Sequence, residues 1–279
     1  MIINGQTEFL TLMGDPIRSV KSPMIYNPHL RKQNINTVLI PVEVSTENFA
    51  NVFKAMIQIH NFKGSLVTMP HKVAAVTLAD ELSVTAQVAG SCNALKLSSD
   101  GKVVGDMFDG EGFVRGIKRK GFDPKDKKAI VIGSGGVGRA IAASLAGAGI
   151  STLCLSDLNI DSCKSLAQRL KTHYPTLEVV FGLENVGTYD LVVNATPLGM
   201  KENDPLPMDI SQLQSHHFVG EVVMKSDITP FLQAAKAKGC QIQVGTDMLF
   251  EQIPAYLEFF DLPTITVEEA RTLAEIQYL

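Results

Sequence analysis

The feature that most constrains the fold is a regular alternation of short apolar runs with helix-like stretches along the whole chain. Runs such as TVLIPV, GSLVTM, KKAIVIG and YDLVVNA are separated by longer amphipathic or alanine-rich stretches. Apolar runs of this length are typical of parallel strands that crossover helices bury on both faces. One stretch differs, because NALKLSSDGKVVGDM favours a hairpin that turns between Ser98 and Gly101. We therefore expect an α/β chain with open, mainly parallel sheets.

A charged run near the middle of the chain interrupts this alternation. The run KRKGFDPKDKK covers residues 118–128, and the alternation restarts after it. A chain of 279 residues also exceeds the usual size of one domain. We expect a first α/β domain in residues 1–118 and a second in residues 119–251. The C-terminal helices, about residues 252–279, are expected to fold back onto the first domain.

Composition argues against several functional classes. The net charge of −4 and the lack of a basic stripe disfavour nucleic-acid binding. No apolar run approaches the ~18–20 residues of a membrane-spanning helix, and the N-terminus has no signal-peptide pattern. The four cysteines are scattered without a CxxC pair, which favours reduced thiols over disulfides or zinc ligands. We expect a cytoplasmic protein that acts on a small molecule, with no metal, membrane or nucleic-acid partner.

The sharpest local signal is the segment AIVIGSGGVGRAIAA. Gly133, Gly135 and Gly138 form a G-x-G-x-x-G pattern directly after a buried strand and before an alanine-rich helix. In such a loop the first glycine allows a tight turn, the second lets the backbone approach a pyrophosphate, and the third lets the helix pack against the strand. Backbone N–H groups at the helix N-terminus then hold the phosphates. The pattern predicts a dinucleotide site that also includes Ser134, Gly136 and Val137.

Two further segments fit a dinucleotide site. The next strand ends in CLSDLN, and Asp157 lies 157 − 138 = 19 residues after Gly138. An acid about 20 residues beyond the loop binds ribose hydroxyls, and its charge repels a 2′-phosphate. We therefore expect NAD, with NADP disfavoured; the alternative is that Asp157 only caps the following helix. The run VVNATPLGM places Asn194, Ala195 and Thr196 at the carboxyl edge of the sheet, where a dinucleotide crosses.

Seven segments together carry a family resemblance. In chain order they are GDPIRSVKSPMIYN, GSLVTMPHK, AGSCNAL, GDMFDGEGF, GSGGVGRA, VNATPLGM and GTDMLFEQ, and they resemble the shikimate and quinate dehydrogenases over nearly the whole chain. The resemblance implies an N-terminal substrate-binding domain, a C-terminal doubly wound Rossmann domain and an active site in the cleft between them. It also implies reversible hydride transfer between NAD or NADP and a ring hydroxyl of a cyclohexene or cyclohexane carboxylate, without a metal.

The resemblance assigns catalytic roles to two residues. Lys72, after VTMPH, matches the family's catalytic lysine, and Asp109, in DMFDG, matches its catalytic aspartate. Hydride can leave the carbinol carbon only if the hydroxyl proton is removed at nearly the same time, which a lysine beside a carboxylate can do. Asp106 is expected to serve the turn instead. By the same resemblance Ser22, Thr68, Asn93 and Gln252 are polar contacts to the substrate, and Gly245 supplies a backbone contact near the nicotinamide.

Five positions depart from the family's pattern, each with an apolar residue in place of a polar one. They are Val20, Leu66, Met107, Phe108 and Met224. A buried polar group without a partner costs roughly 1–3 kcal/mol, so these replacements disfavour a substrate with many hydroxyls. We expect Phe108 and Met224 to line the substrate pocket, which then suits a ring with fewer hydroxyls or with an apolar substituent. Shikimate remains the first named substrate to test.

Two other functions stay open. The same two-domain plan serves methylene-folate and amino-acid dehydrogenases, although VTMPHK together with DMFDG disfavours them. The five apolar replacements also fit a nucleotide-binding sensor without turnover, against which Lys72, Asp109, Asn93 and Gln252 argue together. The sequence leaves both a monomer and a homodimer open.

Overall fold

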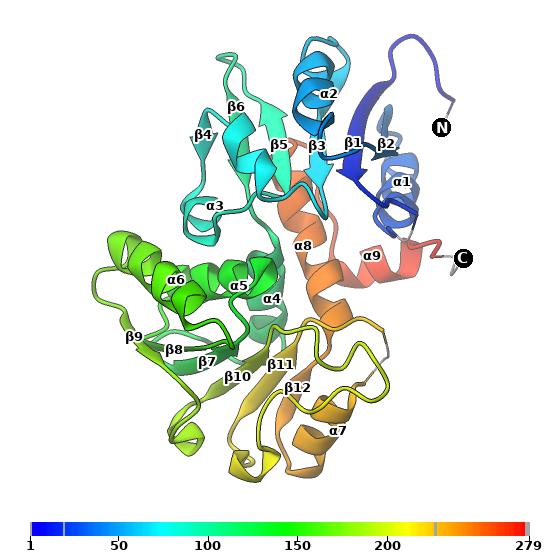
Figure 1. Ribbon diagram of the computed structural model, residues 1–279. Helices are drawn as coiled ribbons and strands as arrows, with labels where there is room; N and C mark the ends of the chain where they lie inside the picture. The colour runs from blue at the N-terminus through cyan, green and yellow to red at the C-terminus, as the bar shows by residue number, and fades with distance from the viewer. Residues whose placement is uncertain (1, 19, 226–227, 277–279) are drawn as a thin grey trace. The chain divides into compact units, whose positions relative to one another are not determined.

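The chain folds into two compact α/β units (Figure 1). The computed structural model describes residues 2–18, 20–225 and 228–276. The first unit comprises the chain up to Ala86, Gly90–Phe108 and the chain from Ile253 onward, and the second comprises Gln87–Ala89 and Asp109–Gln252. Within the described ranges each unit holds one six-stranded sheet. The expected α/β class is confirmed.

The sheet of the first unit mixes parallel and antiparallel pairs, in the strand order β2-β1-β3-β5-β6-β4. β1 pairs in parallel with β2 and β3, and β5 pairs antiparallel with β3 and β6. β5 and β6 form the expected hairpin, in which Ser98 N–H donates to Lys102 O at 2.8 Å and Gly101 has a φ of +83°. The strands are β1 (Glu8–Gly14), β2 (Thr37–Glu43), β3 (Phe62–Val67), β4 (Glu81–Leu82), β5 (Ala94–Leu97) and β6 (Val103–Asp106).

The helices of the first unit bury aromatic side chains against this sheet. Phe49 and Phe53 of α2 pack in one cluster with Met13 of β1 and Val67 of β3. Burying a side chain of this size stabilises the fold by about 1.5–3 kcal/mol relative to leaving it exposed. The helices are α1 (Pro23–Lys32), α2 (Phe49–Met56), α3 (Val84–Ala89, whose last three residues group with the second unit), the second half of α8 (Gly245–Phe259), α9 (Val267–Leu273) and the 3-10 turn η1 (Ala74–Leu78).

The sheet of the second unit is parallel throughout, in the strand order β12-β11-β10-β7-β8-β9. Its central strands read KAIVI and LVVN and are buried along almost their whole length, as expected for strands that helices cover on both faces. The strands are β7 (Lys128–Ile132), β8 (Thr152–Ser156), β9 (Glu178–Phe181), β10 (Leu191–Asn194), β11 (Phe218–Glu221) and β12 (Gln241–Gln243).

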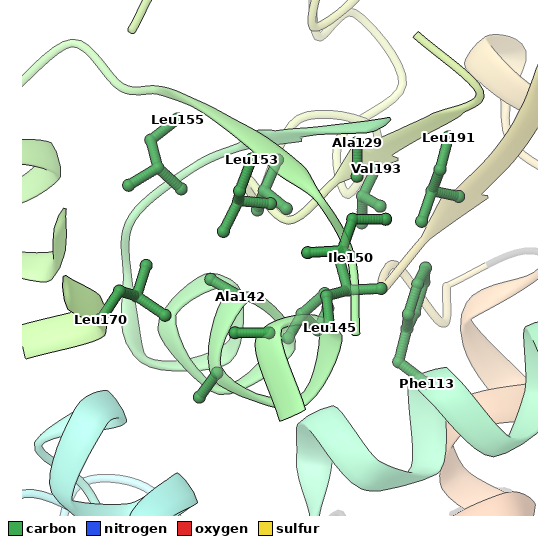
Figure 2. Close-up of a cluster of buried hydrophobic side chains, with 14 of the residues drawn as sticks. Phe113, Ala129, Ala142, Leu145, Ile150, Leu153, Leu155, Leu170, Leu191 and Val193 are labelled. Atoms are coloured by element: carbon green, nitrogen blue, oxygen red, sulfur yellow. The ribbon is translucent and has the colours of Figure 1, made fainter. Parts of the chain in front are cut away.

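The larger core of the second unit lies between its sheet and helices that include α4, α5 and α6. Figure 2 shows Leu153, Leu155 and Val193 of the strands beside Leu145 of α5 and Phe113 of α4. The helices are α4 (Asp109–Arg119), α5 (Gly136–Gly147), α6 (Ile160–His173), α7 (Pro230–Ala237), the first half of α8, and the 3-10 turns η2 (Val186–Thr188) and η3 (Ile210–Gln212). None of the helices in the described ranges is long and apolar enough to cross a membrane.

The division between the units differs from the sequence-based boundary. Residues 109–118 were expected in the first domain, but they form α4 and group with the second unit. The reason is packing: a Cβ at Gly110 would lie only 2.0 Å from Ala140 O of α5, so the two helices are in close contact. The charged run, which begins at Lys118 in the last turn of α4, is held to α8 by ion pairs. Arg119 pairs with Glu251, and Lys120 Nζ lies 2.6 Å from Asp247 Oδ2 of α8.

Candidate active site

The glycine loop joins β7 to α5 in the second unit and has one packed side and one open side. Gly133 has a φ of +101°, which glycine adopts without strain. A Cβ at Gly138 would lie 1.9 Å from Gly133 O, so only glycine lets α5 start this close to the strand. A Cβ at Gly135 or Gly136, in contrast, would meet no atom within 4 Å. The loop backbone can therefore be approached from its open side.

The open side presents backbone donors. α5 begins after Gly135, and no side chain of the described residues caps its N-terminus. The first N–H groups of a helix have no partner inside the helix and favour anions, so Gly136 and Val137 lie where a pyrophosphate would bind. Contacts to two helices hold the loop in place. Ser134 is 2% exposed with its Oγ 3.2 Å from Cys163 Sγ of α6, and Arg139 Nε of α5 donates to Ser134 O at 2.7 Å.

Asp157 follows β8 and lies beside the glycine loop. Its Oδ2 accepts a hydrogen bond from Ser134 N–H at 2.6 Å, and its Oδ1 accepts one from Asn159 N–H at 2.8 Å. Asn159 caps α6, because its Oδ1 accepts from the N–H groups of Asp161 and Ser162. The alternative that Asp157 caps this helix is therefore wrong. A carboxylate has about four acceptor positions, so Asp157 retains capacity for ribose hydroxyls.

Asn194 ends β10 and shapes the loop that follows. Its Oδ1 accepts from Thr196 N–H at 3.1 Å and from the Thr196 hydroxyl at 2.6 Å, while its Nδ2 donates to Leu198 O at 3.0 Å. This loop lies against the glycine loop, since a Cβ at Gly133 would be 2.8 Å from Ala195 O. Gly245, the first residue of α8, packs on the chain after β11 in the same unit: its Cβ would lie 2.1 Å from Val223 O.

Lys72 lies in the first unit, in the turn between β3 and η1, and its neighbours fix its backbone. The ring of His71 stacks on Phe49 at 4.3 Å, and His71 Nε2 lies 2.7 Å from Val44 O. Cys92 N–H donates to Lys72 O at 2.8 Å. Burial raises the pKa of the Cys92 thiol to about 12, an effect that the positive charge of Lys72 partly opposes. The backbone of Lys72 is thus held by the packing of His71 before it and by the hydrogen bond from Cys92.

The two acids in DMFDG have different surroundings. Asp106 ends β6, and its Oδ1 accepts hydrogen bonds from the Ser83 hydroxyl and from Met107 N–H. Asp109 is the first residue of α4 in the second unit and is 5% exposed. A carboxylate in the first turn of a helix is favoured by the helix dipole. The structure therefore uses Asp106 to hold the turn, in agreement with the sequence-based expectation.

The expected substrate contacts are divided between the units. Asn93 is fully buried in the first unit, and its Oδ1 accepts from Phe108 N–H at 2.9 Å. Thr68 follows β3 in the same unit, where its N–H donates to Met13 O. Ser22 precedes α1 without capping it through its side chain. Gln252 belongs to the second unit and is 8% exposed, and no described residue hydrogen-bonds to its Oε1.

The five apolar replacements do not share one environment. Leu66 and Met107 are fully buried, whereas Val20 is partly buried and Met224 is exposed. Phe108 packs inside the first unit, with its ring 4.8 Å from Tyr256 and 5.5 Å from Phe259 of α8. This aromatic cluster was missed from the sequence, because the residues that meet Phe108 follow it by about 150 positions.

Sequence reasoning also missed Glu221 at the end of β11 and Thr229 before α7, both fully buried. The only local signal was Thr229-Pro230 at the start of a helix pattern, which predicts a cap and nothing more. No group of three or more His, Cys, Asp or Glu side chains within the described ranges could hold a metal ion. The four cysteines are buried and unpaired as disulfides.

The donor set fits a dinucleotide in the second unit. It combines an open glycine loop at an uncapped helix N-terminus with a carboxylate at the end of the neighbouring strand. The first unit supplies an anchored lysine and a set of polar groups next to apolar ones. Such groups can orient a partly apolar molecule and move a proton, but on their own they cannot accept a hydride.

Comparisons with known proteins agree with this combination. The family model described as the shikimate dehydrogenase substrate binding domain matches residues 12–95. Shikimate dehydrogenase (NADP(+)) of Desulforamulus reducens is 32% identical over 284 residues, which cover 99% of this chain and 97% of the relative. The enzyme of the same name from Alkaliphilus oremlandii is 30% identical over 268 residues, 93% of each chain.

Solved structures give the same result. Shikimate 5-dehydrogenase from Listeria monocytogenes, in complex with shikimate and NAD, matches with a TM-score of 0.91 and 25% identity over 97% of each chain. Quinate dehydrogenase from Corynebacterium glutamicum, in complex with NAD, matches with a TM-score of 0.86 and 29% identity, covering 96% of this chain and 98% of the other.

Proposed function

Because the chain belongs to the shikimate dehydrogenase family, we propose that it moves hydride reversibly between a nicotinamide dinucleotide and a ring hydroxyl of a cyclic hydroxy acid. Shikimate and quinate are the first named substrates to consider. The observation that carries the proposal is the glycine loop of the second unit, open at Gly135 and closed at Gly138. The similar structures support it: a shikimate 5-dehydrogenase in complex with shikimate and NAD, and a quinate dehydrogenase in complex with NAD.

The units divide the work in this proposal. The first unit binds the substrate through Ser22, Thr68 and Asn93, and the second binds the dinucleotide through the glycine loop, Asp157, and residues 194–196. Gly245 is assigned a backbone contact near the nicotinamide. When bound, the dinucleotide supplies the hydride acceptor. Support comes from the match of each residue to the family's motifs and, for the second unit, from the open loop and the helix N-terminus beside it.

Lys72 and Asp109 are assigned the proton. Oxidation of a carbinol leaves a ketone only if the hydroxyl proton departs with the hydride, and a positioned lysine or carboxylate can accept that proton. The anchored backbone of Lys72 supports this role, because a proton acceptor must be held within hydrogen-bond reach of the hydroxyl. Gln252 contributes an acceptor, its buried Oε1, to a substrate hydroxyl.

NAD is proposed as the preferred cofactor. The carboxylate of Asp157 lies at the loop, and the next residue, Leu158, is fully exposed and carries no charge that could attract a 2′-phosphate. The names of the curated relatives specify NADP(+), and the similar structures contain NAD in two cases and NADP(H) in another. The local chemistry of this chain is what favours NAD here.

The substrate is proposed to carry fewer hydroxyls than shikimate, or an apolar substituent. Leu66 and Met107 are buried, they precede Lys72 and Asp109 in the sequence by six and two positions, and neither can hydrogen-bond to a hydroxyl. Each unpaired hydroxyl would cost about 1–3 kcal/mol, or roughly five- to 150-fold in binding. Phe108 was expected to line the substrate pocket. Its ring packs on Tyr256 and Phe259, and we propose that it forms part of an apolar surface of that pocket.

The test follows absorbance of the reduced cofactor at alkaline pH. Purified protein is mixed with NAD or NADP and with shikimate, quinate or less hydroxylated ring analogues, and Lys72→Ala is the control. Turnover that Lys72→Ala abolishes supports the proposal, and the preferred ring identifies the substrate class. Dinucleotide binding without turnover of any ring would favour the sensor, and turnover of an amino acid or a methylene-folate instead would favour the other dehydrogenase classes.

A further inference from the structure

A fully buried carboxyl group lies at the carboxyl end of β11, outside the residues assigned above. Glu221 is 1% exposed and is the last residue of this strand in the second unit. A buried carboxyl group needs hydrogen-bond partners, because leaving it unpaired away from water is costly. Its partners therefore show what the group does.

Two neutral side chains reach Glu221. The Thr229 hydroxyl donates to Glu221 Oε2 at 2.9 Å, and the amide of Asn194 lies close enough to the same carboxyl group to lower its pKa as a donor. Asn194 and Glu221 are directly paired in the register of β10 and β11, so their side chains lie on the same face of the sheet. Thr229 also caps α7, since its Oγ1 accepts from Leu232 N–H at 3.3 Å.

Asn194 connects this carboxyl group to the loop at residues 195–199. Its Oδ1 accepts both hydrogen bonds from Thr196, and its Nδ2 donates to Leu198 O. An ionised Glu221 accepts from the Asn194 amide and holds it in this orientation. A protonated Glu221 is a weaker acceptor for the Asn194 amide, and its new O–H lies beside Asn194 Oδ1, the oxygen that Thr196 uses. Protonation thus weakens the contact that orients Asn194 and adds a donor that competes with the loop for one oxygen atom.

The ionisation of Glu221 falls in the neutral range. Burial raises the pKa of Glu221 from 4.5 to about 7, and the hydrogen bonds from Thr229 and Asn194 partly oppose this rise. On the neighbouring strand β12, Gln243 pairs with Gly220, and it too is neutral. No charged side chain of the described residues contributes to the pKa shift. The pKa of Glu221 is therefore determined by burial and by two neutral partners.

We propose that Glu221 is a positioning residue for the loop at residues 195–199. Its ionised form, acting through Asn194, orders this loop for dinucleotide binding. The inference rests on the proposed dinucleotide site. It predicts that affinity for the dinucleotide falls by about tenfold as pH drops from 8 to 6, which is the loss expected for one hydrogen bond to a charged group. It concerns affinity, and Glu221 takes no part in proton transfer to the substrate.

The experiment measures the Kd of NADH by its fluorescence between pH 6 and pH 8.5. The chain contains no tryptophan, so protein emission interferes little. NADH is the probe because, unlike NADPH, it has no phosphate monoester that titrates near pH 6. In wild type the Kd should weaken through an inflection near pH 7. Glu221→Gln should bind about tenfold more weakly at pH 8 and show no inflection.

Two variants of Thr229 make the test independent of the folding of Glu221→Gln. Thr229→Val removes the hydroxyl that favours the ionised form, so the inflection should move to higher pH, whereas Thr229→Ser should keep it in place. An unchanged pH profile in Glu221→Gln, or in Thr229→Val relative to Thr229→Ser, overturns the inference. A wild type that binds NADH without pH dependence overturns this inference alone, and a wild type that binds neither NADH nor NADPH overturns the dinucleotide site with it.

Discussion

Asp157 Oδ2 accepts the backbone N–H of Ser134 at 2.6 Å, which places a negative charge at the mouth of the glycine loop. Dinucleotides with and without a 2′-phosphate differ at the ribose that this carboxylate would meet. We therefore expect this charge to influence cofactor preference more directly than any other single group of the loop.

The first prediction concerns this preference. Wild type should favour NAD over NADP in kcat/KM, and the double variant Asp157→Asn with Leu158→Arg should improve NADP by about tenfold to a hundredfold, equivalent to about 1.4–2.7 kcal/mol. The carboxylate repels the extra phosphate, and an arginine would pair with it. Initial rates with both cofactors measure the effect, with Leu158→Ala as the uncharged control. A wild type that prefers NADP would contradict the assignment of Asp157.

The second prediction contrasts two glycines of the same loop. Gly138→Ala should destabilise the protein by about 1–3 kcal/mol or more, because its Cβ would lie 1.9 Å from Gly133 O. Gly135→Ala should keep the unfolding midpoint within a few degrees of wild type but weaken dinucleotide binding, since its Cβ enters the open side of the loop. Urea denaturation and NADH titration separate the two effects. Tight NADH binding by Gly135→Ala would show that the dinucleotide does not approach here.

The third prediction distinguishes the two acids of DMFDG. Asp109→Asn should lower kcat by about 10²- to 10⁴-fold with little change in stability, because it removes a proton acceptor. Asp106→Ala should instead cost about 1–3 kcal/mol of stability, since the Ser83 hydroxyl and Met107 N–H lose their acceptor. Urea unfolding and steady-state kinetics on both variants give the comparison. The reverse pattern would exchange their roles.

The fourth prediction concerns Lys72. Lys72→Ala should lower kcat by about 10²- to 10⁴-fold while the Kd of the dinucleotide stays the same. Lys54→Ala, at an exposed position on α2 of the same unit, is the matched control and should behave as wild type. Single-turnover kinetics on a substrate identified in the screen provides the measurement. Retention of more than a tenth of the rate by Lys72→Ala would rule the lysine out as an essential proton acceptor.

The fifth prediction concerns stability against pH. Burial raises the pKa of Glu221 from 4.5 to about 7. The protonated carboxyl group therefore contributes to the free energy of unfolding in full below pH 4.5, and this contribution is lost as pH rises through 7. Glu221→Gln cannot ionise, so wild type should lose up to about 3 kcal/mol relative to this variant between pH 4.5 and pH 8. Urea unfolding across this range tests it, and parallel stability curves for the two proteins would contradict the buried ionisation.

The sequence predicted the features that depend on local pattern. Strand alternation indicated the α/β class, turn residues indicated the hairpin at Ser98–Gly101, and the spacing from Gly133 to Asp157 indicated which strand ends meet. These features depend on periodicity and on short chain segments, which a single sequence displays directly.

Features that depend on long-range packing could not be predicted in this way. α4 was expected in the first unit because a charged run follows it, yet Gly110 packs it against α5. The ring of Phe108 meets Tyr256 and Phe259, and the carboxyl group of Glu221 meets Asn194 and Thr229, partners that no local pattern identifies. Each of these contacts follows from how the folded chain fills space.

The discontinuity of the first unit has a consequence for biosynthesis. Its core and surface are completed by the last residues of the chain: Phe259 packs on Phe108, Lys96 pairs with Asp261 at 2.7 Å, and Glu275 N–H donates to Met24 O. On the ribosome, the first unit must therefore wait for the segment after residue 252, which is made once Asp109–Gln252 is complete. A nascent chain that stalls soon after residue 252 would carry a complete second unit and a first unit with exposed apolar surface, which chaperones and proteases recognise.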